Sequence, residues 1–310
     1  TTLDEVCTNG DNLTNCITTL SQKSISGATN IYYHDSNLEN GANDNSYRYA
    51  GPSDKVNNFI CFGSTTSPCP TDNLYRIIGV IDGKAKLIKY DYMTTDELGT
   101  DGVYFGDYTY GSSTYKGNNY ANIASYYWNI DTQTNTWSES LLNKTNLNTN
   151  FTNYIGEEWA NKIAMTTWKV GGNTFENIVH SVPSIAYQNE IVNPDATNST
   201  DNATEYQAKI GLMYVSDYGF AASPSAWTLT MDSYNNTTAT NNNWMYMGLF
   251  EWTISRNAGY SDCVFAVSID GYVGFKDADL IYAVRAVFNL VSSITYKSGS
   301  GTMSDPIIIN

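Results

Sequence analysis

The sequence has few basic residues and very few histidines. Only 16 Lys and Arg residues stand against 31 Asp and Glu residues among 310, which gives a formal net charge of −15 at pH 7. Because proteins bind nucleic-acid backbones by neutralising phosphates with Lys and Arg, this shortage predicts no nucleic-acid partner. The chain has two histidines, too few for a His-rich metal site. We therefore expect neither a nucleic-acid-binding protein nor a His-based metalloprotein.

Long apolar runs are also missing. The richest apolar stretch, residues 280–291, is interrupted by Arg285 and Asn289. It falls short of the roughly 20 apolar residues that cross a bilayer as a helix. We therefore expect no membrane span.

The chain has enough apolar and aromatic residues to form a sizeable core. Apolar residues make up 41% of the sequence and aromatic residues 14%, with 25 Tyr, 10 Phe and 7 Trp. Charged residues make up only 15%, yet the mean hydropathy is −0.36, so Asn, Thr and Ser provide most of the polarity. The length suggests about two domains or one large domain, and the composition excludes global disorder.

Four of the five cysteines fall into two close pairs near the start of the chain. Cys7 is near Cys16, and Cys61 and Cys69 bracket a turn-rich loop of a length that a disulfide closes easily. Two disulfides would place the protein outside the cytoplasm, either at the cell surface or in the extracellular medium. The alternative is that the four cysteines are reduced and structural. Cys263 is left without a partner, and the sequence does not determine its state.

The chain changes character after residue 72. Residues 1–72 contain short polar runs, the paired cysteines and turn-forming segments, which predicts an irregular, disulfide-stapled N-terminal extension that is also a candidate assembly arm. Residues 73–310 form the predicted main domain. It opens with two β-rich runs, 74–81 and 84–90, around Asp82 and Gly83, a strong hairpin signal.

The pattern of the main domain predicts an α+β fold. Apolar residues at helical spacing indicate two or three short helices over 137–163, starting near Trp137. Strands are expected at 210–215, 244–252 and 283–290, and a second Asp-Gly hairpin over 264–275. Together these elements predict a twisted, mainly antiparallel sheet, one cluster of short helices and long loops.

Several of these segments resemble a family. The run 74–79 with its hairpin, the helix 137–151, the strand 211–216, and the segments 252–256, 265–267, 271–273 and 284–287 resemble an uncharacterised domain of surface proteins from gut bacteria. That domain looks like a divergent C-type-lectin-like fold, distantly similar to the formylglycine-generating-enzyme fold and to diversified ligand-binding domains. The resemblance covers residues 73–310 and implies a binding role by analogy.

The chain lacks the residues on which the better-known activities of these folds depend. Formylglycine-generating enzymes use a pair of C-terminal cysteines to hold copper, and here only Cys263 lies in the second half of the chain. The Glu-Pro-Asn, Gln-Pro-Asp and Trp-Asn-Asp motifs of calcium-dependent lectins are absent. We expect no cofactor and no metal site; the segment 129–135 resembles a loose calcium loop but lacks the Gly and closing Glu of an EF-hand.

The hairpin over 263–275 is the predicted ligand-binding face. Alternation along its strands turns Phe265, Val267 and Val273 inward and the intervening residues outward. Outward positions of a comparable segment contact ligand in the resembling diversified domains. The candidate ligand-binding residues, a mixture of aromatic and small polar types, are Asn257, Tyr260, Ser261, Ala266, Ser268, Asp270, Tyr272, Phe275 and Asp277. The alternative is an ordinary solvent-facing hairpin.

The last strand suggests self-assembly. Ile307, Ile308 and Ile309 are apolar without alternation, so both faces of this strand require burial. Pairing of terminal strands between copies would build a filament, whereas a monomer would bury the strand in its own sheet.

These observations predict a non-catalytic, extracellular bacterial surface protein that recognises a glycan or protein ligand, with a repeating filament subunit as an extension of that role. The alternatives are a purely structural filament or surface-layer subunit and a secreted carbohydrate-active enzyme. The acidic pairs in the sequence are more typical of solvated surface, so no catalytic residue is expected.

Overall fold

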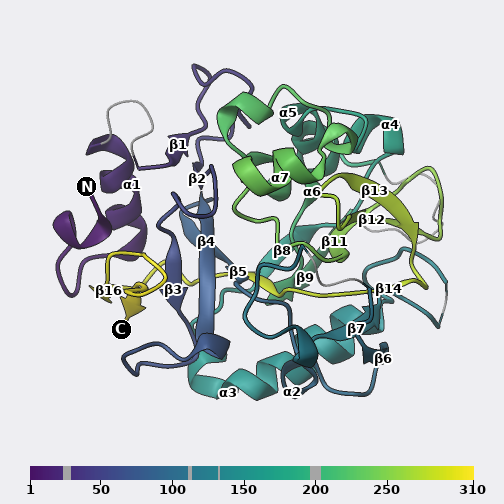
Figure 1. Ribbon diagram of the computed structural model, residues 1–310, viewed down its shortest axis with the longest axis horizontal. Coiled ribbons are helices and arrows are strands. Elements are labelled where there is room, and N and C mark those ends of the chain that lie inside the picture. Colours follow the sequence, from purple (N-terminus) through teal and green to yellow (C-terminus); the bar gives the residue numbers. More distant parts are fainter. Residues whose placement is uncertain (24–28, 111–113, 132, 196–203) are drawn as a thin grey trace.

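A computed structural model describes residues 1–310 except 24–28, 111–113, 132 and 196–203. It combines several antiparallel sheets with short helices, so the expected α+β class is confirmed (Figure 1). Every pairing between the strands named below is antiparallel.

The largest sheet has seven strands and is built around the first predicted hairpin. Leu74–Ile81 (β4) and Lys84–Lys89 (β5) pair on either side of Asp82 and Gly83. Both turn residues have positive φ angles, 50° and 70°, the left-handed region that Asp-Gly turns favour. The strand order is β1-β2-β4-β5-β15-β10, with β3 also paired to β4. The other strands of this sheet are β1 (Ile31–Tyr33), β2 (Tyr47–Tyr49), β3 (Phe59–Cys61), β10 (Ile210–Gly211) and β15 (Val287–Asn289).

The expectation of an irregular N-terminal extension is wrong. Residues 1–72 contribute a helix, α1 (Leu13–Lys23), and three strands of the largest sheet. Strands β2 and β3 both pair with β4, across the boundary expected at residue 72. Buried Arg76 strengthens this connection, because its Nε donates to Oδ1 of Asn58 at 2.6 Å and its Nη2 to the carbonyl oxygen of Val56 at 2.8 Å. Each of the three strands spans only three residues, too few to show a period in the sequence.

The remaining strands form smaller sheets. Strands β11 (Glu251–Arg256), β12 (Cys263–Val267) and β13 (Val273–Asp277) form one three-stranded sheet, which contains the second predicted hairpin. The other small sheets comprise β6 (Tyr104–Asp107), β7 (Ala124–Tyr127) and β14 (Ile281–Tyr282); β8 (Thr166–Lys169) and β9 (Glu205–Ala208); and β16 (Tyr296–Ser298) and β17 (Ile308–Ile309).

Short helices lie between the strands. The helical cluster expected over 137–163 is present as a π-helix at Leu142–Phe151, followed directly by α3 (Thr152–Ala160). Gly156 interrupts α3 with a φ of 80°, in agreement with the short helices expected over 137–163. The other α-helices are α2 (Thr95–Leu98), α4 (Phe175–Ile178), α5 (Pro183–Tyr187), α6 (Val215–Phe220) and α7 (Asn236–Asn242). A second π-helical turn, Gln188–Val192, continues α5.

All seven tryptophans are buried. Their indole N–H groups help to fix distant segments against one another: Trp244 donates to the carbonyl oxygen of Tyr49 at 2.8 Å, and Trp252 to that of Tyr126 at 2.9 Å. The tryptophans therefore belong to the core, and exposed aromatic surface comes from Tyr and Phe.

The last strand lies inside its own subunit. Ile307 and Ile309 are buried, and β17 pairs with β16. On its other side, Ile307 donates its N–H to the carbonyl oxygen of Phe59 and accepts from the N–H of Cys61, at 2.9 and 2.8 Å. This arrangement matches the alternative of a last strand buried in its own sheet. This strand therefore has no free edge through which the expected assembly could form.

Both predicted cysteine pairs lie at disulfide distance. Cys7 pairs with Cys16 and Cys61 with Cys69, with Cα–Cα distances of 5.7 and 5.9 Å. Within the described ranges, no helix combines the length and apolar character needed to cross a bilayer, as expected.

Candidate functional site

The second hairpin is present, but more of it is buried than alternation predicts. Phe265, Val267 and Val273 are buried, as expected. All five residues of β12 are buried, however, because this strand lies between β11 and β13 and is covered on both faces. The alternating pattern of the sequence therefore predicts one solvent-facing side for β12, but both sides of this strand are buried.

Three of the nine candidate ligand-binding residues are buried, although the alternating pattern predicts that they are exposed. Asn257, Ala266 and Ser268 are each at most 2% exposed. Oδ1 of Asn257 accepts the N–H of Gly259 at 2.8 Å, and Oγ of Ser268 accepts the N–H of Asp270 at 3.2 Å. Both polar side chains stabilise turns, so their roles here are structural.

The other six candidate residues are at least partly exposed, but they do not form one surface. Tyr260, Ser261, Phe275 and Asp277 lie toward the open end of the hairpin, whereas Asp270 and Tyr272 lie at its turn. Successive side chains of a strand point to opposite faces, so Tyr272 is on the opposite face of β13 from Phe275. Only the group at the open end brings aromatic side chains together.

An exposed row of rings extends from this end of the hairpin to helix α4. Tyr260 stacks on Phe275 with ring centroids 5.6 Å apart and planes 10° apart. Phe275 meets Phe175 edge-on at 5.4 Å, and Phe175 stacks on His180 at 6.1 Å. Tyr260 and Phe275 are 57% and 39% exposed, and the His180 side chain is 60% exposed. We call Tyr260, Phe275, Phe175 and His180 the aromatic row.

An ion pair ends the aromatic row. Nδ1 of His180 lies 2.7 Å from Oδ2 of Asp232. The hydrogen bond to this carboxylate raises the pKa of His180, and Glu176 acts in the same direction. Sequence reasoning missed Phe175 and His180, because nothing in their spacing connects them with a hairpin nearly a hundred residues further along the chain.

Acidic side chains lie near the hairpin end of the aromatic row. Asp262, Asp277 and Asp279 line a small cavity of about 80 Å³ together with Gln133, which belongs to the segment weighed as a calcium loop. Thr132 of that segment lies outside the described residues. Within the described residues, these three carboxylates do not meet as a cluster with all ligand atoms within 4.8 Å of one another, so their geometry does not define a metal site.

Cys263 is a buried free thiol beside these acids. Its Sγ donates to Oδ1 of Asp277 at 3.4 Å and to Oδ1 of Asp262 at 3.5 Å. Burial and these carboxylates raise the pKa of the Cys263 thiol well above its usual value, so it stays protonated and unreactive.

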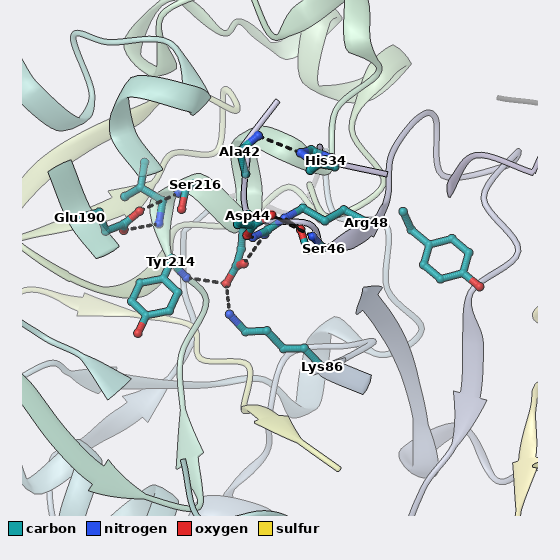
Figure 2. Close-up of polar contacts among 12 residues, drawn as sticks. His34, Ala42, Asp44, Ser46, Arg48, Lys86, Glu190, Tyr214 and Ser216 are labelled. Atoms are coloured by element: carbon teal, nitrogen blue, oxygen red, sulfur yellow. Dashed lines mark hydrogen bonds and ion pairs between the residues drawn. The ribbon is translucent and has the colours of Figure 1, made fainter. Parts of the chain in front are cut away.

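A second candidate site, which the sequence did not reveal, is a charged cavity of about 340 Å³. It opens beside β5 and β8, and we define it by Arg48, Lys86, Trp168, Lys169, Tyr214 and Asp217. Figure 2 shows Arg48 and Lys86 extending from their strands toward Tyr214 and the start of α6.

An ion network lies at the base of the charged cavity. Asp217 accepts from three donors: Nζ of Lys86 at 2.5 Å, Nη1 of Arg48 at 3.3 Å and the N–H of Tyr214 at 3.1 Å. Nη2 of Arg48 also donates to Oδ2 of Asp44 at 2.8 Å (Figure 2). The ammonium group of Lys86 lies over the Tyr214 ring, 4.6 Å from its centroid. The network holds both cations in fixed positions before any ligand arrives.

Burial shifts the ionisation of this network. Burial lowers the pKa of Lys86, and Asp217 opposes this effect only in part. Burial alone would raise the pKa of Asp44, but Arg48 and the hydrogen bonds from Ser46 together outweigh it and hold that pKa at about 2. For Arg48, burial is outweighed by Asp44 and Asp217, so its pKa is raised.

Glu190 lies near this network and interacts electrostatically with Lys86. Its carboxylate accepts the N–H groups of Val215 and Ser216 at 2.8 and 3.0 Å (Figure 2). It also accepts the hydroxyl of Ser255. Burial raises the pKa of Glu190 to about 7, although these hydrogen bonds oppose the shift.

His34 is also buried nearby. Its Nδ1 accepts the N–H of Ala42 at 3.0 Å (Figure 2), and burial lowers its pKa to about 3. His34 is therefore neutral and structural.

Comparisons with protein-family models, with curated proteins and with solved structures found no match for this chain.

Proposed function

We propose that the protein is a non-catalytic, extracellular recognition protein that binds a neutral glycan on the aromatic row. The proposed scaffold is a C-type-lectin-like fold located at a bacterial surface. The observation that carries the proposal is the row itself: four rings in contact, three of them well exposed, in a chain that buries all its tryptophans. The two disulfides support a place outside the cytoplasm.

The geometry of the row suits a sugar ring. Aromatic side chains provide rigid, apolar contact area for the C–H face of a pyranose. The stacking of Tyr260 on Phe275 and the edge contact with Phe175 limit ring motion, so little side-chain entropy is lost on binding.

The polar groups around the row favour a neutral ligand. Ser261 follows Tyr260, and Asp277 lies two residues beyond Phe275 on the same face of β13. Carboxylates accept hydrogen bonds from sugar hydroxyls, whereas the net charge of −15 repels acidic glycans.

A glycan and protein array with three proteins tests this proposal. The wild type should bind a neutral glycan, and the double variant Tyr260→Ala with Phe275→Ala should lose at least about tenfold in affinity, because each stacking ring contributes about 1 kcal/mol. Phe105→Ala is the matched control: Phe105 is 55% exposed but lies on β6, and its removal should leave binding unchanged.

The other outcomes each point to a rival function. If the wild type binds nothing, the structural-subunit alternative replaces this proposal. Binding to proteins alone overturns the glycan assignment. Turnover of a polysaccharide by the wild type supports the enzyme alternative and overturns the non-catalytic role.

A further inference from the structure

We propose that the charged cavity binds a small carboxylate-bearing sugar, one of about monosaccharide size. This site is separate from the aromatic row, and the proposal does not depend on the function proposed above. It rests on the unused donors of Lys86 at the base of the cavity, on the size of the cavity and on its local charge balance.

The lining of the cavity has more basic than acidic side chains. Of its lining residues, four are basic and two are acidic, namely Arg48, Lys84, Lys86 and Lys169 against Asp82 and Asp217. The cavity lining thus carries a formal charge of +2 in a chain whose net charge is −15. Asp44 and Glu205, which are not among the lining residues, pair with Arg48 and Lys169 and balance this charge. The cavity with its ion-pair partners is therefore neutral, so it repels an anion less than the acidic molecule as a whole does.

The base of the cavity contains a cation with unused hydrogen-bond donors. The carboxylate of Asp217 already accepts from Lys86, Arg48 and the backbone N–H of Tyr214. Within the described part of the chain, Nζ of Lys86 donates one hydrogen bond, to Asp217, and an ammonium group has three donors. Two donors of Lys86 thus remain for a ligand, and a carboxylate is the matching acceptor.

The position of Lys86 strengthens this interaction. The residue is 5% exposed, so few waters compete for its ammonium group. Charge-assisted hydrogen bonds in such a desolvated site are stronger than those at the surface. Because Asp217 already holds Lys86 in place, binding costs little side-chain entropy.

The size of the cavity suits a monosaccharide. The Trp168 and Tyr214 rings, 6.1 Å apart, are 1% and 6% exposed, and the ammonium group of Lys86 lies 5.7 Å from the centroid of the Trp168 ring. These rings hold Lys86 in position and do not themselves face the ligand. A volume of about 340 Å³ lies at the lower end of the range for small-molecule sites. The base therefore takes the carboxylate, and the remaining volume takes the sugar ring.

Methionine signals locate binding in solution. Met165 lines the cavity and is 61% exposed, whereas Met303 is 41% exposed and lies outside it. With methyl-labelled methionine, titration of the wild type with glucuronate should shift the Met165 methyl signal in NMR spectra and leave that of Met303 in place. Glucose, which has the same ring without the carboxylate, should bind at least about tenfold more weakly.

A variant and a third ligand complete the test. Lys86→Met keeps the length of the side chain without its charge and should abolish the preference for glucuronate over glucose; circular dichroism checks its fold. If the variant does not fold, the wild-type titrations decide alone. Equal binding of glucose and glucuronate, no Met165 shift up to about 50 mM glucuronate, or tighter binding of glucose 6-phosphate would each overturn the assignment.

Discussion

Nζ of Lys86 lies 2.5 Å from Oδ2 of Asp217, a residue 131 positions further along the chain. This pair joins strand β5 of the largest sheet to helix α6. Because Asp217 also accepts from Arg48 of β2, one carboxylate connects three elements in the interior. The ion network thus has a structural role as well as the binding role proposed for Lys86.

Replacing Asp217 by Asn should destabilise the protein strongly. The change removes the carboxylate that pairs with both buried Arg48 and buried Lys86, and breaking a buried ion pair typically costs about 3–5 kcal/mol. Denaturant unfolding measures the change. The control is Asp54→Asn, since Asp54 pairs with Lys55 at 3.5 Å on the exposed surface and should contribute less than about 1 kcal/mol. Equal effects of the two substitutions would contradict a stabilising role for the network.

Glu190 should make stability depend on pH. Its native pKa of about 7 lies above the usual value of 4.5. Between pH 4.5 and pH 7, the native state therefore keeps a proton that the unfolded state has lost. The stability that this group contributes is full below pH 4.5 and is lost as pH rises through 7.

The variant Glu190→Gln removes this titration. Relative to the wild type, its free energy of unfolding should rise between pH 4.5 and 7 by at most about 1.4 kcal/mol per pH unit. Denaturant unfolding at several pH values measures the difference. Glu158→Gln, on the exposed part of α3, should give a profile parallel to that of the wild type. A parallel profile for Glu190→Gln as well would exclude the proposed shift.

Two glycines with almost the same φ angle allow the cost of backbone strain to be distinguished from the cost of a steric clash. Gly10 and Gly248 have φ angles of 98° and 99°. A Cβ atom at Gly10 would meet nothing within 4 Å, whereas one at Gly248 would lie 1.9 Å from the carbonyl oxygen of Thr114. Gly10→Ala should therefore cost about 1–2 kcal/mol, and Gly248→Ala several kcal/mol more. Thermal unfolding of both variants is the measurement, and similar melting temperatures would argue against this packing.

Thiol labelling checks the cysteine assignments. The native protein should not react with iodoacetamide, because Cys263 is buried and its pKa is raised. After denaturation without reductant, one label should be added, and after reduction five. Intact mass spectrometry counts the labels. More than one label before reduction would mean that a predicted disulfide is not formed.

Local signals in the sequence predicted the parts of the fold that depend on neighbouring residues. The hairpin at Asp82-Gly83 is present because an Asp-Gly turn specifies the pairing of the strands on either side of it. The strand expected over 210–215 extends only over Ile210–Gly211, since helix α6 begins at Val215. Asp217 caps that helix by accepting the N–H of Tyr214. The sequence gives little sign of this cap, because Tyr is not a usual residue at the start of a helix.

Long-range features could not be predicted. The run 244–252 reads as a strand, but the only strand in it begins at Glu251, and the preceding residues pack irregularly into the core through contacts such as that of Trp244 with Tyr49. Apolar content alone does not separate a buried loop from a buried strand. The aromatic row and the charged cavity join residues from distant segments, and a single sequence contains no signal that pairs them.

The first and last segments of the chain lie side by side. The Asn310 side chain donates to Oδ1 of Asn9 at 3.0 Å, and the N–H of Gly10 donates to the carbonyl oxygen of Tyr296 at 2.8 Å. Figure 1 shows both ends at one extreme of the longest axis and hairpin β12–β13 toward the other. A sensor chip or fluorescent tag attached at either end should therefore leave Tyr260 and Phe275 facing the solution, and the two attachment points should give the same binding signal.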